Sequence, residues 1–369
     1  MIEMFRKEGF KPLYGTWELT LRCNMNCLHC GSRAGKKRGD ELTVDEKLRL
    51  ADDLTRMGNR KMTLSGGEPL LCEDWPQVAK RLTDGGSRVN MISNGYTFTE
   101  ETLEQAREAG LVNMGFSIDG DEEVHDRIRR KKQAFERVVR ALDICAKGGF
   151  PTAVVTTINR LNAHMLEEMV QFFIDHGVSA WQPQFGFDYG NLSDHPDLLL
   201  VPNDLMEIIP KIAELQKTRK QEIMVQPAND VGYYTEEEQA FRGENYGVES
   251  FWLGCPAGLQ VVGIEANGNI KGCLSMQDPQ FVEGNIREEP FEEIWCKEGN
   301  FSYTRDFKVD DLSGFCRECQ YAEFCRGGCS WTSHLQGRGT GGRTNRYCLY
   351  RVCEEQGLIG GTFCPKSND

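Results

Sequence analysis

Residues 14–30 read YGTWELTLRCNMNCLHC. The first nine form a short run with the aromatic and β-branched residues that favour a strand. Cys23, Cys27 and Cys30 follow at once with CxxxCxxC spacing. Three thiolates on one tight loop can hold three irons of a cubane [4Fe–4S] cluster and leave the fourth iron open to a small molecule. A three-cysteine zinc knuckle is the alternative that this segment alone leaves open.

Beyond this loop, strand signals and helix signals alternate, and Thr43 with Glu46 forms a capping box. Such alternation predicts an α/β fold with a parallel sheet and helices outside it. Six units are fewer than the eight that close a full barrel, so we expect a partial (β/α)6 TIM-like barrel with its chemistry at the C-terminal strand ends. The predicted strands are 14–22, 61–65, 88–93, 112–119, 152–159 and 180–187, and the predicted helices are 40–58, 74–85, 99–109, 134–147 and 163–176.

The second half of the chain loses this pattern. Residues 205–217 predict one helix, and the polar stretch that follows reads as a linker. The region after Trp252 is rich in Gly, Cys and aromatic residues, so we expect a small cysteine-rich iron–sulfur domain held by metal rather than by a large apolar core. The expected domains are a barrel at 1–215, a linker at 216–250, the cysteine-rich domain at 251–355 and a tail at 356–369.

Composition narrows the function further. The chain has 369 residues and a net charge of −13, which argues against a nucleic-acid partner. It has no apolar run long enough for a membrane span and no secretory h-region at its start, so we expect a cytoplasmic protein. Of its fifteen cysteines, ten lie between Cys255 and Cys364. Clustered cysteines in a reducing compartment point to metal or catalysis rather than disulfides.

The cysteine loop after the first strand resembles that of the radical S-adenosylmethionine (SAM) superfamily. The resemblance implies that the open iron binds the amino and carboxylate groups of SAM. It also implies reductive cleavage of SAM to a 5′-deoxyadenosyl radical, which abstracts a substrate hydrogen. His29 stands where many members have an aromatic residue.

Polar, glycine-containing turns end three further predicted strands, and each alone would be an ordinary turn. Glu68 can accept from an ammonium group, and Ser117 with a basic residue such as Arg129 suits a carboxylate. In the resembling family, the first turn holds the SAM amino group and the second contacts its ribose. Arg127, Arg137 and Arg140 are rivals of Arg129. The predicted SAM-binding residues are Gly66, Gly67, Glu68, Pro69, Ser93, Asn94, Ser117 and Arg129.

The C-terminal cysteines resemble the seven-cysteine signature of the SPASM extension of radical SAM enzymes, whereas zinc ribbons prefer paired CxxC knuckles. The resemblance implies two auxiliary [4Fe–4S] clusters, and hence three clusters in all. It assigns Cys255, Cys273 and Cys329 to auxiliary cluster I, for which we favour Cys353 as fourth ligand; an open site is the alternative. Auxiliary cluster II takes Cys316, Cys319, Cys325 and Cys348. We read Cys72, Cys145, Cys296 and Cys364 as structural or incidental.

SPASM enzymes typically modify peptides or proteins, so we expect a maturase that oxidises a residue of a peptide. Its expected partners are the peptide, a separate small leader-recognition protein and a reductant such as flavodoxin or ferredoxin. Sulfatase maturation is disfavoured, because Leu274 follows Cys273 where those enzymes have an Asp base. The alternatives are an oxidoreductase or decarboxylase acting on a haem precursor, a non-catalytic iron–sulfur protein and a zinc-stabilised binding module. No general acid or base is nominated.

Overall fold

The computed structural model describes residues 6–7, 9–243 and 251–358. The chain divides into two compact units, each built from two separate stretches of sequence. Unit 1 comprises Met1–Ala153 and Pro256–Asp306, and unit 2 comprises Val154–Cys255 and Phe307–Asp369. Within the described residues, no helix is both long enough and apolar enough to cross a membrane.

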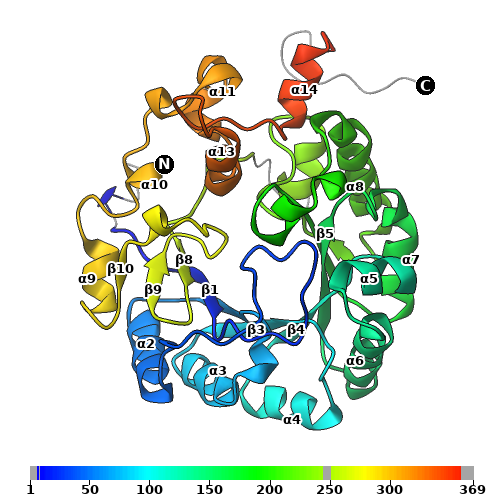
Figure 1. Ribbon diagram of the computed structural model, residues 1–369, viewed down its shortest axis with the longest axis vertical. Coiled ribbons are helices and arrows are strands. Elements are labelled where there is room, and N and C mark those ends of the chain that lie inside the picture. The colour runs from blue at the N-terminus through cyan, green and yellow to red at the C-terminus, as the bar shows by residue number, and fades with distance from the viewer. Residues whose placement is uncertain (1–5, 8, 244–250, 359–369) are drawn as a thin grey trace. The chain divides into compact units, whose positions relative to one another are not determined.

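Unit 1 is built on a largely parallel sheet (Figure 1). Strand β1 (Tyr14–Glu18) lies between β2 (Lys61–Ser65) and β8 (Val261–Ile264) and runs parallel to both. Strands β3 (Arg88–Ser93) and β4 (Asn113–Ser117) extend it on one side. Strands β9 (Asn269–Lys271) and β10 (Gly284–Asn285) extend it antiparallel on the other. The parallel strands therefore end at one common edge.

The helices of unit 1 pack on this sheet through apolar faces, which include the buried Leu50, Leu54, Val78 and Leu82. The predicted capping box starts α2, because the Thr43 side chain accepts from the Glu46 backbone N–H. The helices are α2 (Val44–Arg56), α3 (Trp75–Asp84), α4 (Glu100–Glu108), α5 (Glu122–Arg129), α6 (Ala134–Gly148), α9 (Phe291–Cys296) and α10 (Ser302–Arg305).

Unit 2 contains most of β5 (Thr152–Ile158), together with β6 (Ala180–Phe185) and β7 (Met224–Val225), which pair in that order. Apart from α7 and α8, the α-helices of unit 2 are short and lie in the cysteine-rich stretch. The helices are α7 (Leu166–Asp175), α8 (Leu205–Arg219), α11 (Gly314–Glu318), α12 (Ala322–Cys325), α13 (Ser330–Gln336) and α14 (Leu349–Glu355). Shorter helical turns of the chain are η1 (Pro69–Leu71), η2 (Ala163–Met165), η3 (Gly190–Asp194), η4 (Pro196–Leu198), η5 (Pro202–Asp204), η6 (Gln239–Gly243), η7 (Pro279–Phe281) and η8 (Val309–Asp311).

The structure confirms the α/β class and all six predicted strands, each within a few residues of its predicted bounds. It adds three features. Helix α5 was not predicted. Strand β7 lies within the stretch read as a linker and pairs with β6. Strand β8 comes from the cysteine-rich half of the sequence but lies next to β1 in the barrel sheet.

Candidate cluster- and cofactor-binding site

The cysteine loop leaves the end of β1 and is closed on itself by backbone hydrogen bonds. The Cys23 N–H donates to the Gly35 carbonyl at 3.0 Å, and the Cys30 N–H donates to the Cys27 carbonyl at 3.3 Å. The Ala34 N–H points at the Cys30 Sγ at 3.4 Å. Burial raises the pKa of the Cys23 thiol to about 12, and the thiols of Cys27 and Cys30 add to the rise. The fold therefore brings the three predicted ligands together.

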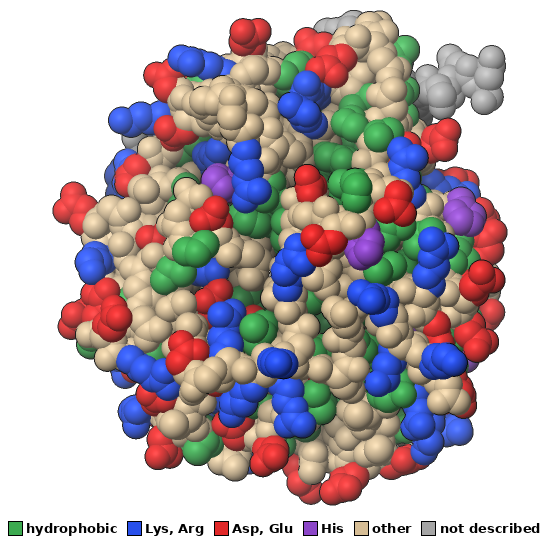
Figure 2. All heavy atoms as spheres, viewed as in Figure 1, with side chains coloured by type: hydrophobic (Ala, Val, Ile, Leu, Met, Phe, Trp, Pro, Cys, Tyr) green, Lys and Arg blue, Asp and Glu red, His purple; other side chains and the backbone are tan. Residues whose placement is uncertain are grey.

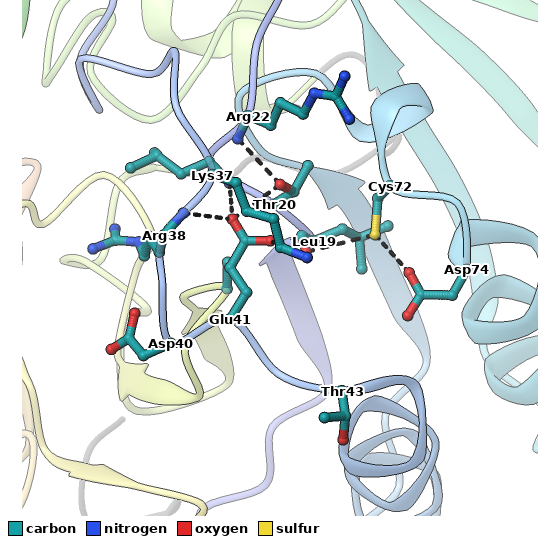
Figure 3. A network of polar contacts seen from close by, with 12 residues as sticks. Leu19, Thr20, Arg22, Lys37, Arg38, Asp40, Glu41, Thr43, Cys72 and Asp74 are labelled. Carbon is teal, nitrogen blue, oxygen red and sulfur yellow. Dashed lines mark hydrogen bonds and ion pairs between the residues drawn. The ribbon is translucent and has the colours of Figure 1, made fainter.

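Glu41 holds the backbone that leads into this loop (Figure 3). Its Oε1 atom accepts from the Thr20 hydroxyl, the Leu21 N–H and the Arg38 N–H, each at 3.0 Å. The Thr20 hydroxyl in turn accepts from the Arg22 N–H at 3.1 Å. One carboxylate thus fixes the chain immediately before the first cysteine.

Gly66 and Gly67 let the turn after β2 lie directly against the same segment. A Cβ at Gly66, where φ is +151°, would sit 2.4 Å from the Thr20 carbonyl oxygen. A Cβ at Gly67 would sit 2.5 Å from the Arg22 carbonyl oxygen. Both neighbours are backbone atoms that cannot swing aside, so these positions require glycine. The two glycines therefore allow this turn to lie against the backbone that leads into the cysteine loop.

Glu68 joins the turns after β2 and β3. Its buried carboxylate accepts from the Ser93 hydroxyl at 2.8 Å, the Asn94 N–H at 2.8 Å and the Leu70 N–H at 3.2 Å. Burial raises the pKa of Glu68 to about 6, although these three donors oppose the rise. The carboxylate is therefore ionised at neutral pH, and an approaching cation would stabilise it.

Ser93 and Asn94, which were predicted to contact a ribose, form side-chain hydrogen bonds with other residues of the site. The Ser93 hydroxyl donates to Glu68, and the Asn94 amide donates to Asn24 Oδ1 at 2.8 Å and accepts from the Tyr96 N–H at 2.9 Å. These bonds tie the turn after β3 to the cysteine loop. The ribose contact stays a prediction.

Arg129 is the basic residue that reaches the cysteine loop. Its Nη1 atom lies 3.8 Å from Cys27 Sγ, and its Nη2 atom lies 2.7 Å from Asp119 Oδ2. Asp119 also pairs with His29 Nε2 at 2.8 Å, and its N–H donates to His125 Nδ1 at 3.2 Å. Among the four candidate arginines, Arg129 is buried, whereas Arg127, Arg137 and Arg140 are exposed.

Asp119 lies two residues after Ser117, at the end of the predicted strand 112–119, and no role was predicted for it. Burial alone would raise the pKa of Asp119, but the charges of Arg129 and His29 outweigh burial and hold that pKa well below its usual range. Burial and the Arg129 charge lower the pKa of His125 to about 3, so His125 is neutral. The signal available in the sequence was an acidic residue at a strand end, followed by a helix that carries Arg127 and Arg129.

The residues around the loop fit a cluster with a bound amino acid moiety. Arg129 Nε and Asn24 Nδ2 are buried donors without a hydrogen-bond partner among the described residues. These two N–H donors can bind a carboxylate, and the Glu68 carboxylate can bind an ammonium group. Among those same residues, no three His, Cys, Asp or Glu side chains converge tightly enough to share one metal ion. A cubane needs wider spacing, because each thiolate binds a different iron.

Cys72 is buried beside the site and is engaged by its neighbours (Figure 3). Its thiol donates to Asp74 Oδ1 at 2.7 Å, and Lys47 Nζ lies 3.1 Å from the sulfur and 2.9 Å from Asp74 Oδ1. This is the packing of a buried ion pair around a neutral thiol. It agrees with a structural reading of Cys72.

Unit 2 gathers the four cysteines predicted for auxiliary cluster II. Burial raises the pKa of the Cys325 thiol, and the nearby thiols of Cys348, Cys316 and Cys319 raise it further. Backbone N–H groups point at two of the sulfurs: Asn345 N–H at Cys316 Sγ, 3.2 Å, and Tyr321 N–H at Cys319 Sγ, 3.5 Å. Donors aimed at sulfur stabilise thiolate charge, as iron–sulfur ligation requires.

The cysteines predicted for auxiliary cluster I are divided between the units: Cys273 belongs to unit 1, and Cys255, Cys329 and Cys353 belong to unit 2. The Cys273 loop packs closely on β8, because a Cβ at Gly263 would lie 2.4 Å from the Cys273 carbonyl carbon. In unit 2, the Cys329 N–H donates to the Tyr233 hydroxyl at 3.0 Å. The ligand set, including Cys353, stays a prediction.

Sequence profiles match both halves of this arrangement. The profile of the radical SAM superfamily matches residues 17–173, and that of an iron–sulfur cluster-binding domain, SPASM, matches residues 255–320. An AdoMet-dependent heme synthase of Methanosarcina barkeri is 30% identical over 347 residues, which cover 92% of this chain and 97% of that protein. The mycofactocin maturase MftC of Mycolicibacterium smegmatis is 26% identical over 339 residues, which cover 89% and 81%.

A solved structure shares the fold. Streptococcus suis SuiB bound to S-adenosylmethionine superposes with a TM-score of 0.74 at 14% sequence identity, over 93% of this chain and 79% of that one. At this identity the likeness concerns architecture alone. The architecture is that of a protein whose crystal structure contains SAM.

Proposed function

The chain belongs to the radical SAM superfamily, in the branch that carries a SPASM domain, and from this premise we propose that it cleaves SAM reductively and oxidises a residue of a peptide or protein. When bound, the cluster and SAM supply the radical that removes a substrate hydrogen. The protein contributes binding, orientation and exclusion of water. The arrangement that carries this proposal is the convergence of Glu68 and Arg129 on the loop of Cys23, Cys27 and Cys30.

We assign the binding roles from the chemistry of the side chains. The Glu68 carboxylate accepts from the SAM ammonium, and Ser93 and Asn94 hold it in place through the bonds they already make. Arg129 Nε, with the Ser117 hydroxyl at the end of β4, serves the SAM carboxylate. Asp119 keeps the Arg129 guanidinium aimed at the loop. Charge-assisted hydrogen bonds of this kind are roughly twice as strong as neutral ones.

Substitution of one ligand tests the central claim. Cys27→Ala should abolish the formation of 5′-deoxyadenosine by the anaerobically reconstituted protein supplied with dithionite. Cys145→Ala is the matched control, because Cys145 is a buried cysteine of α6 that we assign to no cluster. Retained cleavage by the Cys27 variant would overturn the mechanism.

We propose three [4Fe–4S] clusters, with the ligand sets given above. The prediction is about twelve irons per chain. The four thiols that gather in unit 2 support the second auxiliary cluster. The Cys316→Ala/Cys348→Ala variant should lose about four irons and keep SAM binding, because its ligands belong to a unit other than the one that holds Cys27 and Arg129.

Two substrate classes agree with the relatives, and one surface feature favours a peptide. A shallow, open depression lies at the start of α5, the helix that ends at Arg129. Four acidic side chains line it: Asp121, Glu122, Glu123 and Asp126. An acidic depression of this kind would attract basic side chains of a peptide. A peptide also agrees with the likeness in fold to Streptococcus suis SuiB, which has been crystallised bound to its precursor peptide SuiA.

A haem precursor is the second candidate, because the M. barkeri heme synthase matches nearly the whole length of both chains. The discriminating experiment incubates the protein anaerobically with SAM and reductant. One arm contains a peptide encoded beside its gene, and the other contains an iron tetrapyrrole. A peptide mass lower by two hydrogens or by a defined larger group establishes the peptide reading. An unchanged peptide, together with a shifted Soret band and loss of carboxyl groups from the tetrapyrrole, establishes the other.

A further inference from the structure

A basic segment lies against the cysteine loop and contrasts with the acidic chain around it. Residues 127–140 read RIRRKKQAFERVVR and contain seven basic residues and one acidic residue, while the whole chain has a net charge of −13. Arg129 is buried in the site described above. The exposed members of the segment are Arg127, Arg130, Lys132, Arg137 and Arg140. Figure 2 shows both signs of charge mixed over the face it views.

The segment touches the loop directly. The Leu28 N–H, inside the cysteine loop, donates to the Ile128 carbonyl of α5 at 2.8 Å. Ala134, the first residue of α6, forms one apolar group with Met25 and Cys27. Backbone and side chain thus fix the end of α5 and the start of α6 on the loop.

Tyr96 connects the basic side chains to the cysteines. It packs, with Cys23 and Cys30, against the apolar group that contains Cys27. On its ring lie Lys131 Nζ, 4.8 Å from the centroid, and the Arg137 guanidinium, 5.6 Å from it. The exposed Arg137 therefore lies on an aromatic ring that itself packs against the apolar group containing Cys27.

The proposed function, reductive cleavage of SAM, needs an electron from outside the chain. We propose that the exposed basic residues of the α5–α6 connection, centred on Lys132 and Arg137, form the docking surface of a small acidic one-electron carrier. The carrier is oxidised by one electron, and the cluster held by Cys23, Cys27 and Cys30 accepts it. Opposite charges steer the encounter and fix its orientation. The contact of this segment with the cysteine loop, through the Leu28 N–H and through Tyr96, places the docked carrier next to that loop.

The acidic depression at the start of α5 limits the surface on one side. Asp126 uses its carboxylate to accept from the Gln133 and Phe135 N–H groups, at 2.7 and 2.9 Å, and so shapes the connection that presents the basic side chains. Asp121 caps the start of α5 by accepting from the Val124 N–H. We therefore expect an acidic carrier to approach over the exposed basic side chains of the connection, because the carboxylates of Asp121, Glu122 and Glu123 at the start of α5 would repel it.

The test compares two double charge reversals. Lys132→Glu/Arg137→Glu lies in the surface, and Lys80→Glu/Lys147→Glu makes the same charge change at exposed positions on α3 and at the far end of α6. The full chain is reconstituted anaerobically and mixed with reduced flavodoxin in a stopped-flow instrument, and the binding of oxidised flavodoxin is measured by calorimetry. We expect the surface variant to be reduced at least about tenfold more slowly at low salt, to bind flavodoxin more weakly, and to lose both differences at high salt.

Dithionite separates this inference from the proposed function on which it rests. Both variants should cleave SAM with excess dithionite as fast as the unaltered chain, because neither alters a ligand or a SAM-binding residue. If the unaltered chain itself fails to cleave SAM with dithionite, the proposed function is wrong. If cleavage is intact but the surface variant and the control variant respond to flavodoxin alike, the docking surface is wrong, whether both are slowed or neither is.

Discussion

Replacement of Glu68 by glutamine gives the sharpest test of the SAM-binding geometry. The Glu68 carboxylate is buried and has a pKa of about 6, against an ordinary value of 4.5. Keeping it ionised without a ligand therefore costs about 2 kcal/mol, since each pKa unit corresponds to about 1.4 kcal/mol. An ammonium group bound beside it removes part of this cost and adds a charge-assisted hydrogen bond.

The expected loss follows from these contacts. The glutamine side chain of the Glu68→Gln variant carries no charge, so the bond to the ammonium weakens by about 1.5–3 kcal/mol, which is a Kd for SAM about 10- to 150-fold higher. One carboxylate oxygen of Glu68 accepts from Ser93 and Leu70, and the other accepts from the Asn94 N–H. The amide NH2 of the variant must face one of these donors, so the substitution also destabilises the fold by about 1–3 kcal/mol.

Calorimetric titration of SAM into the anaerobically reconstituted protein between pH 5 and 8 measures the loss of affinity and its pH dependence. In the unaltered chain, SAM affinity should fall as the pH drops below about 6, because protonation removes the charge that the ammonium needs. The glutamine variant should bind weakly at every pH without this transition. Glu73→Gln is the matched control on an exposed residue of the same segment. Unchanged affinity in Glu68→Gln, with the pH transition retained, would refute the assignment of Glu68 to the ammonium group.

Three further substitutions probe the rest of the site. Asp119→Asn leaves the buried Arg129 charge without its 2.7 Å partner and should lower the free energy of unfolding by about 3–5 kcal/mol, measured by urea denaturation; a change below about 1 kcal/mol would contradict the buried pair. Gly67→Ala places a Cβ 2.5 Å from a backbone carbonyl of the cysteine loop and should cost about one third of the bound iron. Cys353→Ala should lower iron content and alter the cluster spectra while Cys145→Ala does not, and identical values in both variants would remove Cys353 from auxiliary cluster I.

Local signals in the sequence predicted most of the strands and helices between residues 14 and 219. The alternation of apolar periodicities gave the six strands, and the Thr43–Glu46 capping box gave the start of α2, because both depend on residues close together in the chain. Helix α5 was missed because only two of its eight residues, EEVHDRIR, are apolar, namely Val124 and Ile128. Its side chains serve the site rather than the core: His125 and Arg129 meet Asp119, and Arg129 reaches Cys27.

Contacts between residues that are far apart in the chain could not be predicted from the sequence. Strand β8 is four residues long and lies next to β1, some 245 positions earlier in the chain. Glu41 reads as an ordinary residue ahead of a helix, yet it binds the backbone before the first cysteine. Strand β8 (VVGI) is apolar and β-branched, but its sequence does not say which strand it joins, and nothing beside Glu41 marks the backbone that it binds. The fold supplies both partners.

The same reasoning explains why Ser93 and Asn94 were predicted as direct ligand contacts while the structure shows them binding protein. A motif identifies which residues belong to a site, but hydrogen-bond capacity decides what each can still do there. Asn94 uses both ends of its amide on Asn24 and Tyr96, whereas Arg129 Nε remains a buried donor without a partner among the described residues. A buried, unpaired donor is costly without a ligand, so binding of a carboxylate there gains more than binding at a residue already satisfied. The recognition of SAM in this chain should therefore depend more on Glu68 and Arg129 than on the turn after β3.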